Sequence, residues 1–219
     1  MQSGQNQMNK LKTTPISKIE WEKIKQDLHF IDLVVKAGKE LGYRIFFHGG
    51  YAVDGNLGKI TRPHNDIDIQ VYGQENDANI AVNKLINEIK KLDPDFQIEQ
   101  LEDKERKEYY HNILIRRSEA SGIDLYYIQI TTNPFAKEKI IVKNDGSLSN
   151  VQNFEELDLV KLEGVKFEAR NATDELVDKI YKRDYRGDKK DPKYDQDIEN
   201  LRLITNSSEV KEKVLNLTK

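Results

Sequence analysis

The first strong pattern in the chain is a run of apolar residues at helical spacing in its N-terminal part. These residues recur three or four positions apart between Trp21 and Leu41, which is the periodicity of one face of an α-helix. Ser17 and Glu20 precede the run at the spacing of a capping box, and Gly42 follows it where helices often end. The pattern therefore predicts one long helix between these two signals.

Shorter apolar runs follow, and they predict a mixture of strands and helices. A strand from Tyr43 to Phe47 leads into a pair of glycines, and the alternation of polar and apolar residues from Asp66 to Tyr72 predicts a second strand. The other predicted elements are a short helix at 51–57, a helix that begins at Asp77, and strands at 96–101, 112–117, 123–131 and 139–142. This order predicts an α+β fold with helices packed on one face of a mixed sheet.

A loop-like segment divides the chain. The run from Lys143 to Ser147 is rich in turn-forming residues, and it predicts a boundary after residue 145. We expect a core at 17–145 and a small, mainly helical C-terminal extension at 146–219. Within the extension, the pattern predicts one strand at 164–168 and helices at 173–182 and 195–204. Residues 1–16 are mostly polar, and we expect them to be disordered.

Composition excludes several classes of protein. The chain has no cysteine, so it has neither a disulfide framework nor a thiolate nucleophile or metal ligand, which fits a cytoplasmic protein. No apolar run approaches the 18 residues or so of a membrane-spanning helix, and the N-terminus lacks the apolar core of a secretory signal. A net charge of −3 argues mildly against a nucleic-acid polymer as substrate.

The segment from His48 to Val71 holds the most informative chemistry. In the sequence Asp66-Ile67-Asp68-Ile69, strand alternation sends both carboxylates to one face and both isoleucines to the other. Two carboxylates roughly 7 Å apart along a strand repel each other unless a cation lies between them. Magnesium typically takes one or two carboxylates together with substrate phosphates. With a glycine pair after the preceding strand, where backbone can approach a ligand closely, the segment predicts a metal-dependent site for a nucleoside triphosphate.

This combination of motifs resembles the DNA polymerase β-type nucleotidyltransferase superfamily. The fifteen-residue linker between Gly50 and Asp66, which contains Gly58 and Thr61-Arg62-Pro63-His64, narrows the resemblance to the lincosamide and aminoglycoside-2''-adenylyltransferase group. The segment from Arg183 to Ile204 echoes the C-terminal pattern of that group less specifically. The resemblance implies a nucleotidyltransferase core and transfer of a nucleoside monophosphate from a triphosphate, ATP being the expected donor, to a hydroxyl of a small acceptor.

Three carboxylates are the candidate catalytic and metal-binding residues. Asp66 and Asp68 are predicted to hold two magnesium ions, and Asp124 is the candidate third ligand or general base. Asp124 lies between apolar neighbours on a strand expected to pair with the Asp66–Asp68 strand, and the superfamily places its third acidic residue in this position. The alternative interpretation of Asp124 is an edge-strand aspartate that faces water.

Other residues are predicted to bind the nucleotide. Gly49 and Gly50 are expected to present backbone N–H groups to the triphosphate at a helix N-terminus, where a tight turn is the alternative. Arg62 and His64 are candidate phosphate contacts or residues that order the acceptor pocket, with a surface salt bridge and an exposed turn histidine as alternatives. Lys179, like its neighbours Lys182 and Arg183, is a candidate phosphate-binding cation, although lysines at such positions are most often exposed and solvated.

The acceptor is the least determined part of the function. The resemblance implies a lincosamide or an aminoglycoside, but Tyr51 stands where that group usually has tryptophan. A toxin-type nucleotidyltransferase that modifies tRNA or a partner protein is a second hypothesis, and it requires a broad basic cleft. A catalytically silent nucleotide-binding protein is a third, and the three carboxylates argue against it. The resemblance also allows a homodimer, since related small enzymes often pair.

Overall fold

The structure is a computed structural model. It describes the backbone of residues 10–72, 78–96, 98–101, 111–119, 122–131, 138–142, 148–153, 157–185 and 192–217, and side chains at 10–71, 80–96, 98, 157–185 and 192–216.

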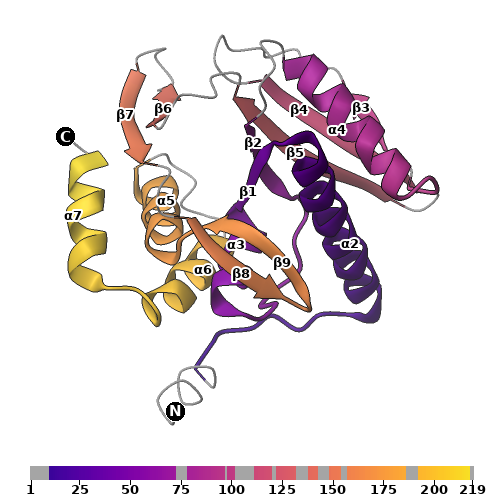
Figure 1. The fold of residues 1–219 in the computed structure, drawn as a ribbon. Coiled ribbons are helices and arrows are strands. Elements are labelled where there is room, and N and C mark those ends of the chain that lie inside the picture. The colour runs from indigo at the N-terminus through magenta and orange to yellow at the C-terminus, as the bar shows by residue number, and fades with distance from the viewer. Residues whose placement is uncertain are drawn as a thin grey trace.

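A seven-stranded mixed sheet forms the centre of the molecule (Figure 1). Its strand order is β3-β4-β5-β2-β1-β9-β8. The strands are β1 (Arg44–His48), β2 (Asp68–Tyr72), β3 (Glu99–Leu101), β4 (His111–Glu119), β5 (Gly122–Thr131), β8 (Leu157–Leu162) and β9 (Val165–Arg170). Strand β1 is parallel to β9 and antiparallel to β2, and β2 is parallel to β5. With the helices described next, this sheet confirms the predicted α+β class.

Two helices pack together beside the sheet and bury its apolar residues. Helix α2 (Lys18–Leu41) lies next to α4 (Ala78–Leu92). The predicted capping box at Ser17 and Glu20 is formed in both directions, and Gly42 ends α2 in the left-handed conformation, so both end signals are confirmed. Between helices and sheet lies a large apolar core that includes Phe30 and Ile69, both fully buried.

The C-terminal helices form a second, smaller apolar cluster. Helix α3 (Gly49–Leu57) contacts α5 (Ala172–Asp184) and α6 (Pro192–Arg202), and α7 (Ser207–Leu217) packs on α5. The shared core of these helices contains Val53, Leu57, Leu176, Val177, Ile198, Leu201 and Val210. Helix α3 therefore links the two cores, since Tyr51 and Ala52 of the same helix belong to the larger one.

Several elements differ from the sequence prediction. Strand β2 begins at Asp68, two residues later than predicted, so Asp66 precedes the strand. The strands β7 (Leu148–Asn153) and β8 and the helix α7 were not predicted. Strand β7 pairs with β6 (Glu138–Val142) in a separate two-stranded sheet, and the predicted boundary at residue 145 falls between them. Because β8 and β9 complete the main sheet beyond that boundary, the sheet continues into the predicted extension.

The segment before α2 lies along the C-terminal helices, although residues 1–16 were expected to be disordered. The Lys12 N–H donates to Asn200 Oδ1 over 2.8 Å, and Asn200 Nδ2 donates to the Lys12 carbonyl over 2.9 Å. The Thr14 N–H donates to the Thr61 carbonyl over 2.8 Å. Side-chain amides can replace secondary structure as partners for backbone groups, so this segment is ordered without being a helix or strand. Residues 1–9 lie outside the described residues.

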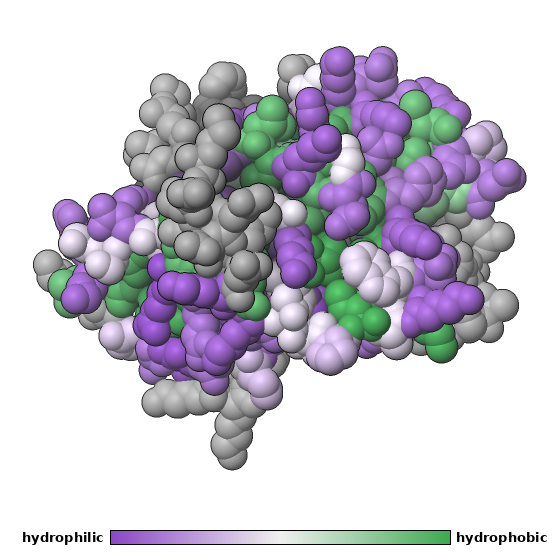
Figure 2. Space-filling model, turned by 90° about the horizontal axis from the view of Figure 1, so that it is seen from below, coloured by the Kyte–Doolittle hydropathy of each residue, from purple (hydrophilic) through white to green (hydrophobic). Residues whose placement is uncertain are grey.

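Surface character is mixed over the described part of the chain. Hydrophilic residues cover much of the face in Figure 2, and hydrophobic residues show in separate areas between them. None of the helices that the structure describes has both the length and the apolar character needed to cross a membrane.

Candidate active site

The candidate site lies where three strand ends meet at one edge of the sheet. Because β1 and β9 are parallel, their C-terminal ends lie side by side, and Phe47 pairs with Ala169. Because β2 is antiparallel to β1, its first residue Asp68 lies opposite His48, the last residue of β1. Helices α3 and α5 both begin at this edge. The topology therefore gathers the glycine turn, the aspartates and the first turn of α5.

Gly49 is confined by the side chain of Asp68. It adopts φ +71°, a left-handed conformation that non-glycine residues rarely take. A Cβ atom at position 49 would overlap with Oδ2 of Asp68. Gly50 is similarly confined, since a Cβ there would overlap with the imidazole ring of His64. The glycine pair therefore permits a close approach of backbone to the aspartate, and no larger residue fits at either position without rearrangement.

Asp66 lies close enough to Asp68 for its charge to affect the pKa of Asp68. Asp66 is exposed, Asp68 is partly buried, and Ile67 and Ile69 between and after them are fully buried, as the predicted alternation requires. Burial and, after it, the charge of Asp66 raise the pKa of Asp68 to about 6, against the opposing effect of Lys182 and Lys179. A divalent cation beside these carboxylates would relieve this repulsion, so the donor set fits a magnesium ion.

Glu175 is a site residue that the sequence analysis did not identify. Its Oε1 accepts the Gly49 N–H over 3.1 Å, and its side chain is fully buried. Nε of Arg170 lies 3.7 Å from the same oxygen. Burial raises the pKa of Glu175, while the charges of Arg170 and Lys179 oppose the rise. The Gly49 N–H is thus donated to Glu175 in this structure, and its binding to the triphosphate stays a prediction.

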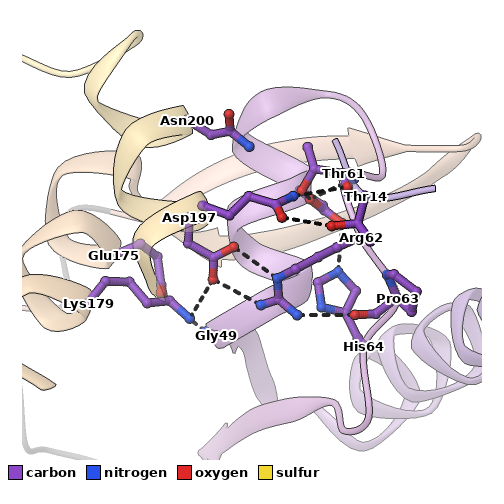
Figure 3. A network of polar contacts seen from close by, with 12 residues as sticks. Thr14, Gly49, Thr61, Arg62, Pro63, His64, Glu175, Lys179, Asp197 and Asn200 are labelled. Carbon is purple, nitrogen blue, oxygen red and sulfur yellow. Dashed lines mark hydrogen bonds and ion pairs between the residues drawn. The ribbon is translucent and has the colours of Figure 1, made fainter. Parts of the chain in front are cut away.

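A buried cluster of charges lies behind the glycine turn (Figure 3). Arg62 binds Asp197 in a bidentate manner, with Nε 3.0 Å from Oδ1 and Nη2 2.9 Å from Oδ2. Lys179 Nζ lies 3.1 Å from Asp197 Oδ2 and 5.4 Å from the ring centroid of Tyr194. Burial would raise the pKa of Asp197, but the hydrogen bond from Arg62 and the charge of Lys179 outweigh it and hold the pKa below its ordinary value.

Arg62 and Lys179 are therefore largely buried and paired, whereas the alternative interpretation of each was an exposed side chain. Lys179 is 4% exposed, and both side chains share Asp197 as a counter-charge. Lys182, one turn further along α5, pairs with Asp178 over 2.7 Å, and Asp178 raises its pKa against the effect of burial. The charges of Lys179 and Lys182 each act on Asp68 more strongly than the opposing charge of Glu175 on the same helix, so α5 presents a net positive field to this aspartate.

His64 is a buried residue that fixes the loop between α3 and β2. Its Nε2 lies 2.6 Å from Oδ2 of Asp54, and its ring lies 4.5 Å from that of Tyr51. The other oxygen of Asp54, Oδ1, accepts bonds from both the backbone N–H and the hydroxyl of Thr61. Asp54 was not identified from the sequence, although its position in α3, one helical turn after Gly50, could have indicated it. The alternative of an exposed turn histidine is excluded, because His64 is 3% exposed.

Asp124 lies on β5, the strand that pairs with β2 as predicted. The register pairs Asp68 with Tyr127, which is three residues after Asp124. The side chain of Asp124 lies outside the described residues, so its role as a third carboxylate stays a prediction. Among the side chains that are described, no group of three carboxylates or histidines is arranged to hold a metal.

The chain is similar to one protein family and to several solved structures. A family model described as aminoglycoside-2''-adenylyltransferase matches residues 30–103, which contain the glycine turn and both aspartates. A solution structure of the antibiotic-resistance factor ANT(2'')-Ia has 17% sequence identity and a TM-score of 0.56, over 87% of this chain and 90% of that one. A crystal structure of ANT(2'')-Ia in complex with adenylyl-2''-tobramycin has 15% identity and a TM-score of 0.59, over 88% and 97%.

A lincomycin-bound structure of the lincosamide adenylyltransferase LnuA is also similar, with 18% identity and a TM-score of 0.46 over 88% of this chain and all of that one. No curated protein matches the sequence. The ANT(2'')-Ia structures establish the nucleotidyltransferase fold, and the family model places its match on the segment that carries the candidate chemistry.

Proposed function

We propose that this chain, which resembles the nucleotidyltransferases and among them the aminoglycoside-2''-adenylyltransferases, is a magnesium-dependent nucleotidyltransferase. It transfers the nucleoside monophosphate of a triphosphate, with ATP as the expected donor, to a hydroxyl of a small molecule. The observation that carries this proposal is the Asp66–Asp68 pair beside the Gly49–Gly50 turn, in the field of Lys179 and Lys182.

Asp66 and Asp68 would hold the magnesium ions, with Asp124 as the proposed third ligand. Their oxygen donors suit a hard divalent ion, and burial together with the charge of Asp66 raises the pKa of Asp68, as expected of such a pair without a cation. When bound, magnesium would supply charge neutralisation at the triphosphate and would acidify the attacking hydroxyl.

The chain itself supplies the remaining positive potential. The N-terminal turn of α3 begins at the site, and backbone N–H groups in the first turn of a helix have no acceptor within the helix; Gly50 lies in that turn. Lys182 is the cation that we assign to the leaving pyrophosphate, because its charge already acts on Asp68 and its side chain is only partly buried. Lys179 acts from a more buried position, where Asp197 fixes its ammonium group.

We assign loop-positioning roles to Arg62 and His64. Arg62 joins the loop after α3 to α6 through Asp197, and His64 joins it to α3 through Asp54. Both bonds lie within four residues of Asp66, so they determine where the first aspartate of the pair is held. Direct contact of either side chain with phosphate stays a prediction.

The proposed reaction is an in-line displacement at the α-phosphorus. An oxygen of the acceptor hydroxyl forms a bond to the α-phosphorus, and the bond from phosphorus to the pyrophosphate oxygen breaks. Asp124 is the proposed base that takes the hydroxyl proton. The electron pair of the broken bond leaves with pyrophosphate, toward the positive field of α5. Most of the rate enhancement would come from positioning and electrostatics, as is general for such transfers.

An aminoglycoside is the acceptor that the comparisons favour. The family model is described by an aminoglycoside-2'' activity, and the ANT(2'')-Ia crystal structure holds an adenylylated tobramycin. Lincosamides are the second acceptor class expected from the sequence. Aminoglycosides are polycations, so an acidic acceptor surface would distinguish the first class from the second.

The test is pyrophosphate release from each of the four common nucleoside triphosphates with magnesium. The acceptors are panels of aminoglycosides and lincosamides and bulk tRNA, and the Asp66→Asn protein is the blank. Release that depends on one drug and on Asp66 would support the proposal and name the acceptor. Release with tRNA alone would replace it by the toxin-type hypothesis, and no release with any acceptor would contradict transfer to these substrates.

A further inference from the structure

The backbone of the glycine turn is held by a carboxylate from the C-terminal part of the chain. Glu175 Oε1 accepts the Gly49 N–H across 126 positions of sequence, and the side chain has no exposed surface. Its second oxygen, Oε2, is buried without a hydrogen-bond partner among the described residues. We propose that Glu175 is a positioning residue for nucleotidyl transfer, which fixes the Gly49 turn and, through it, the carboxylate of Asp68. The proposal rests on the function proposed above.

The topology explains why this residue reaches the turn. Strands β1 and β9 are parallel neighbours, so the helices that follow them, α3 and α5, begin at the same edge of the sheet. Asn171 caps α5, and its side chain accepts the N–H of Asp174. Glu175 follows in the first turn, where the helix dipole favours a negative charge. A carboxylate at this position can therefore bind the first backbone amide of α3.

The Gly49 turn transmits the position of Glu175 to the aspartate pair. Oδ2 of Asp68 lies against Gly49 in the volume that a side chain would fill, so a shift of the turn changes the space available to that carboxylate. The left-handed conformation of Gly49 is costly for most residues and easily altered in glycine, so an external hydrogen bond is needed to select it. Glu175 supplies that bond from a site without solvent, where it is strong.

Arg170 allows a carboxylate to remain here without repelling the triphosphate. Its Nε lies 3.7 Å from Glu175 Oε1, and the arginine is itself 6% exposed. The positive charge of Arg170 offsets the negative charge of Glu175 behind the turn. Glu175 therefore does not cancel the positive field of Lys182. A purely structural carboxylate would stabilise the fold equally well, and the experiment must separate these two roles.

Three variants separate positioning from stability. Glu175→Ala removes the acceptor of the Gly49 N–H, whereas Glu175→Gln keeps an amide oxygen that can accept it. Asp174→Ala is the matched control, because Asp174 is the preceding acidic residue of α5 and bonds Lys213 of α7 instead of the turn. For each protein, we would measure amide exchange at Gly49 by NMR, kcat and KM for ATP with magnesium, and thermal unfolding.

We expect Glu175→Ala to lose protection at the Gly49 amide and to lose kcat by on the order of tenfold to a hundredfold. Glu175→Gln should keep the protected amide and retain kcat to within about fivefold, and Asp174→Ala should resemble the unmodified protein in both. A loss of kcat that exceeds the change in thermal stability would support positioning. A purely structural role would lower kcat only together with thermal stability. If Glu175→Ala does not fold, the Glu175→Gln protein decides the question.

Unchanged kcat and KM in Glu175→Ala would overturn the proposal. So would a Glu175→Gln protein that keeps the protected Gly49 amide and still loses kcat a hundredfold. Failure of the proposed function gives a different result: the unmodified protein would release no pyrophosphate, while the Gly49 amide would still lose protection in Glu175→Ala and keep it in Glu175→Gln. The amide measurement therefore distinguishes an incorrect reaction from an incorrect role for Glu175.

Discussion

The Oδ2 atom of Asp68 lies beside Gly49, in the volume that the Cβ atom of any other residue at position 49 would occupy. This contact joins the two motifs that stand out in the sequence, the glycine pair and the aspartate pair. It arises because β1 and β2 are antiparallel and His48 lies opposite Asp68. A glycine is therefore required at this position for two independent reasons, the left-handed backbone and the adjacent carboxylate.

Substitution of Gly49 should affect activity far more than stability alone explains. Gly49→Ala introduces a side chain where Asp68 lies, and we expect transfer activity to fall on the order of a hundredfold. Gly58→Ala is the matched control, because Gly58 has nearly the same φ of +68° and no atom within 4 Å of a Cβ. Both variants should lose roughly 1–2 kcal/mol of stability from backbone strain. Equal activities in the two proteins would contradict the importance of the contact.

Removal of either aspartate charge should abolish transfer in a folded protein. Asp66→Asn and Asp68→Asn each eliminate a proposed magnesium ligand, and steady-state pyrophosphate release should fall by at least about a hundredfold. Asp95→Asn serves as the control, because Asp95 is an exposed aspartate far along the chain from the site. Circular dichroism would establish that all three proteins are folded. Full turnover in either site variant would refute the assignment.

The stability of the protein should depend on pH through Asp68. Its pKa is about 6 in the fold, against an ordinary value of 3.8, so the folded state binds the proton more tightly than the unfolded state. The contribution of Asp68 to the free energy of unfolding is fully present below about pH 4 and is lost as pH rises through about 6. A shift of this size corresponds to a loss of up to about 3 kcal/mol.

Chemical denaturation at several pH values would measure this effect. In Asp68→Asn, the loss between pH 4 and pH 6 should be smaller, and the free energy of unfolding at pH 7 without magnesium should be higher than in the unmodified protein. Magnesium should stabilise the unmodified protein at pH 7 and have little effect on the variant. If the free energy of unfolding of Asp68→Asn depends on pH as that of the unmodified protein does, the pKa of Asp68 is not raised in the fold.

Loss of Asp197 should destabilise the protein strongly. Asp197→Ala leaves Arg62 and Lys179, both largely buried, without their shared counter-charge. The expected cost is about 3–5 kcal/mol, as is typical when one partner of a buried ion pair is removed. Asp195 lies on α6, as Asp197 does, and it is an exposed partner of Arg183. Asp195→Ala should therefore cost no more than about 1 kcal/mol. Urea unfolding of both proteins measures the difference, and similar values would contradict it.

The N-terminal segment should be released when its clamp is removed. Asn200 is 1% exposed, and its side-chain amide binds both backbone groups of Lys12. We expect Asn200→Ala to cost about 1–3 kcal/mol and to make residues 10–16 sensitive to limited proteolysis. Glu199→Gln is the control, since Glu199 pairs with the exposed side chain of Lys12 instead of its backbone. Mass spectrometry of the cleavage products would locate the cuts, and equal cleavage of the two variants would contradict the clamp.

The sequence alone determined the local features of this protein. The capping box at Ser17, the end of α2 at Gly42 and the burial of Ile67 and Ile69 depend on neighbours within a few residues, so their patterns could be interpreted directly. The resemblance of the segment from His48 to Val71 to a family indicated the nucleotidyltransferase fold. Strands β7 and β8 were not predicted, because their sequences lack a clear alternation of apolar and polar residues.

Only the tertiary structure decided which distant residues complete the site. Glu175 reaches Gly49, and Asp197 holds both Arg62 and Lys179, through contacts that span more than a hundred positions or join separate helices. Nothing in local spacing specifies such pairs, since they depend on the parallel register of β1 and β9 and on the packing of α6 beside α3. Burial then changes the chemistry of these groups: a charged residue that the sequence presents as solvated becomes a fixed electrostatic element once water is excluded.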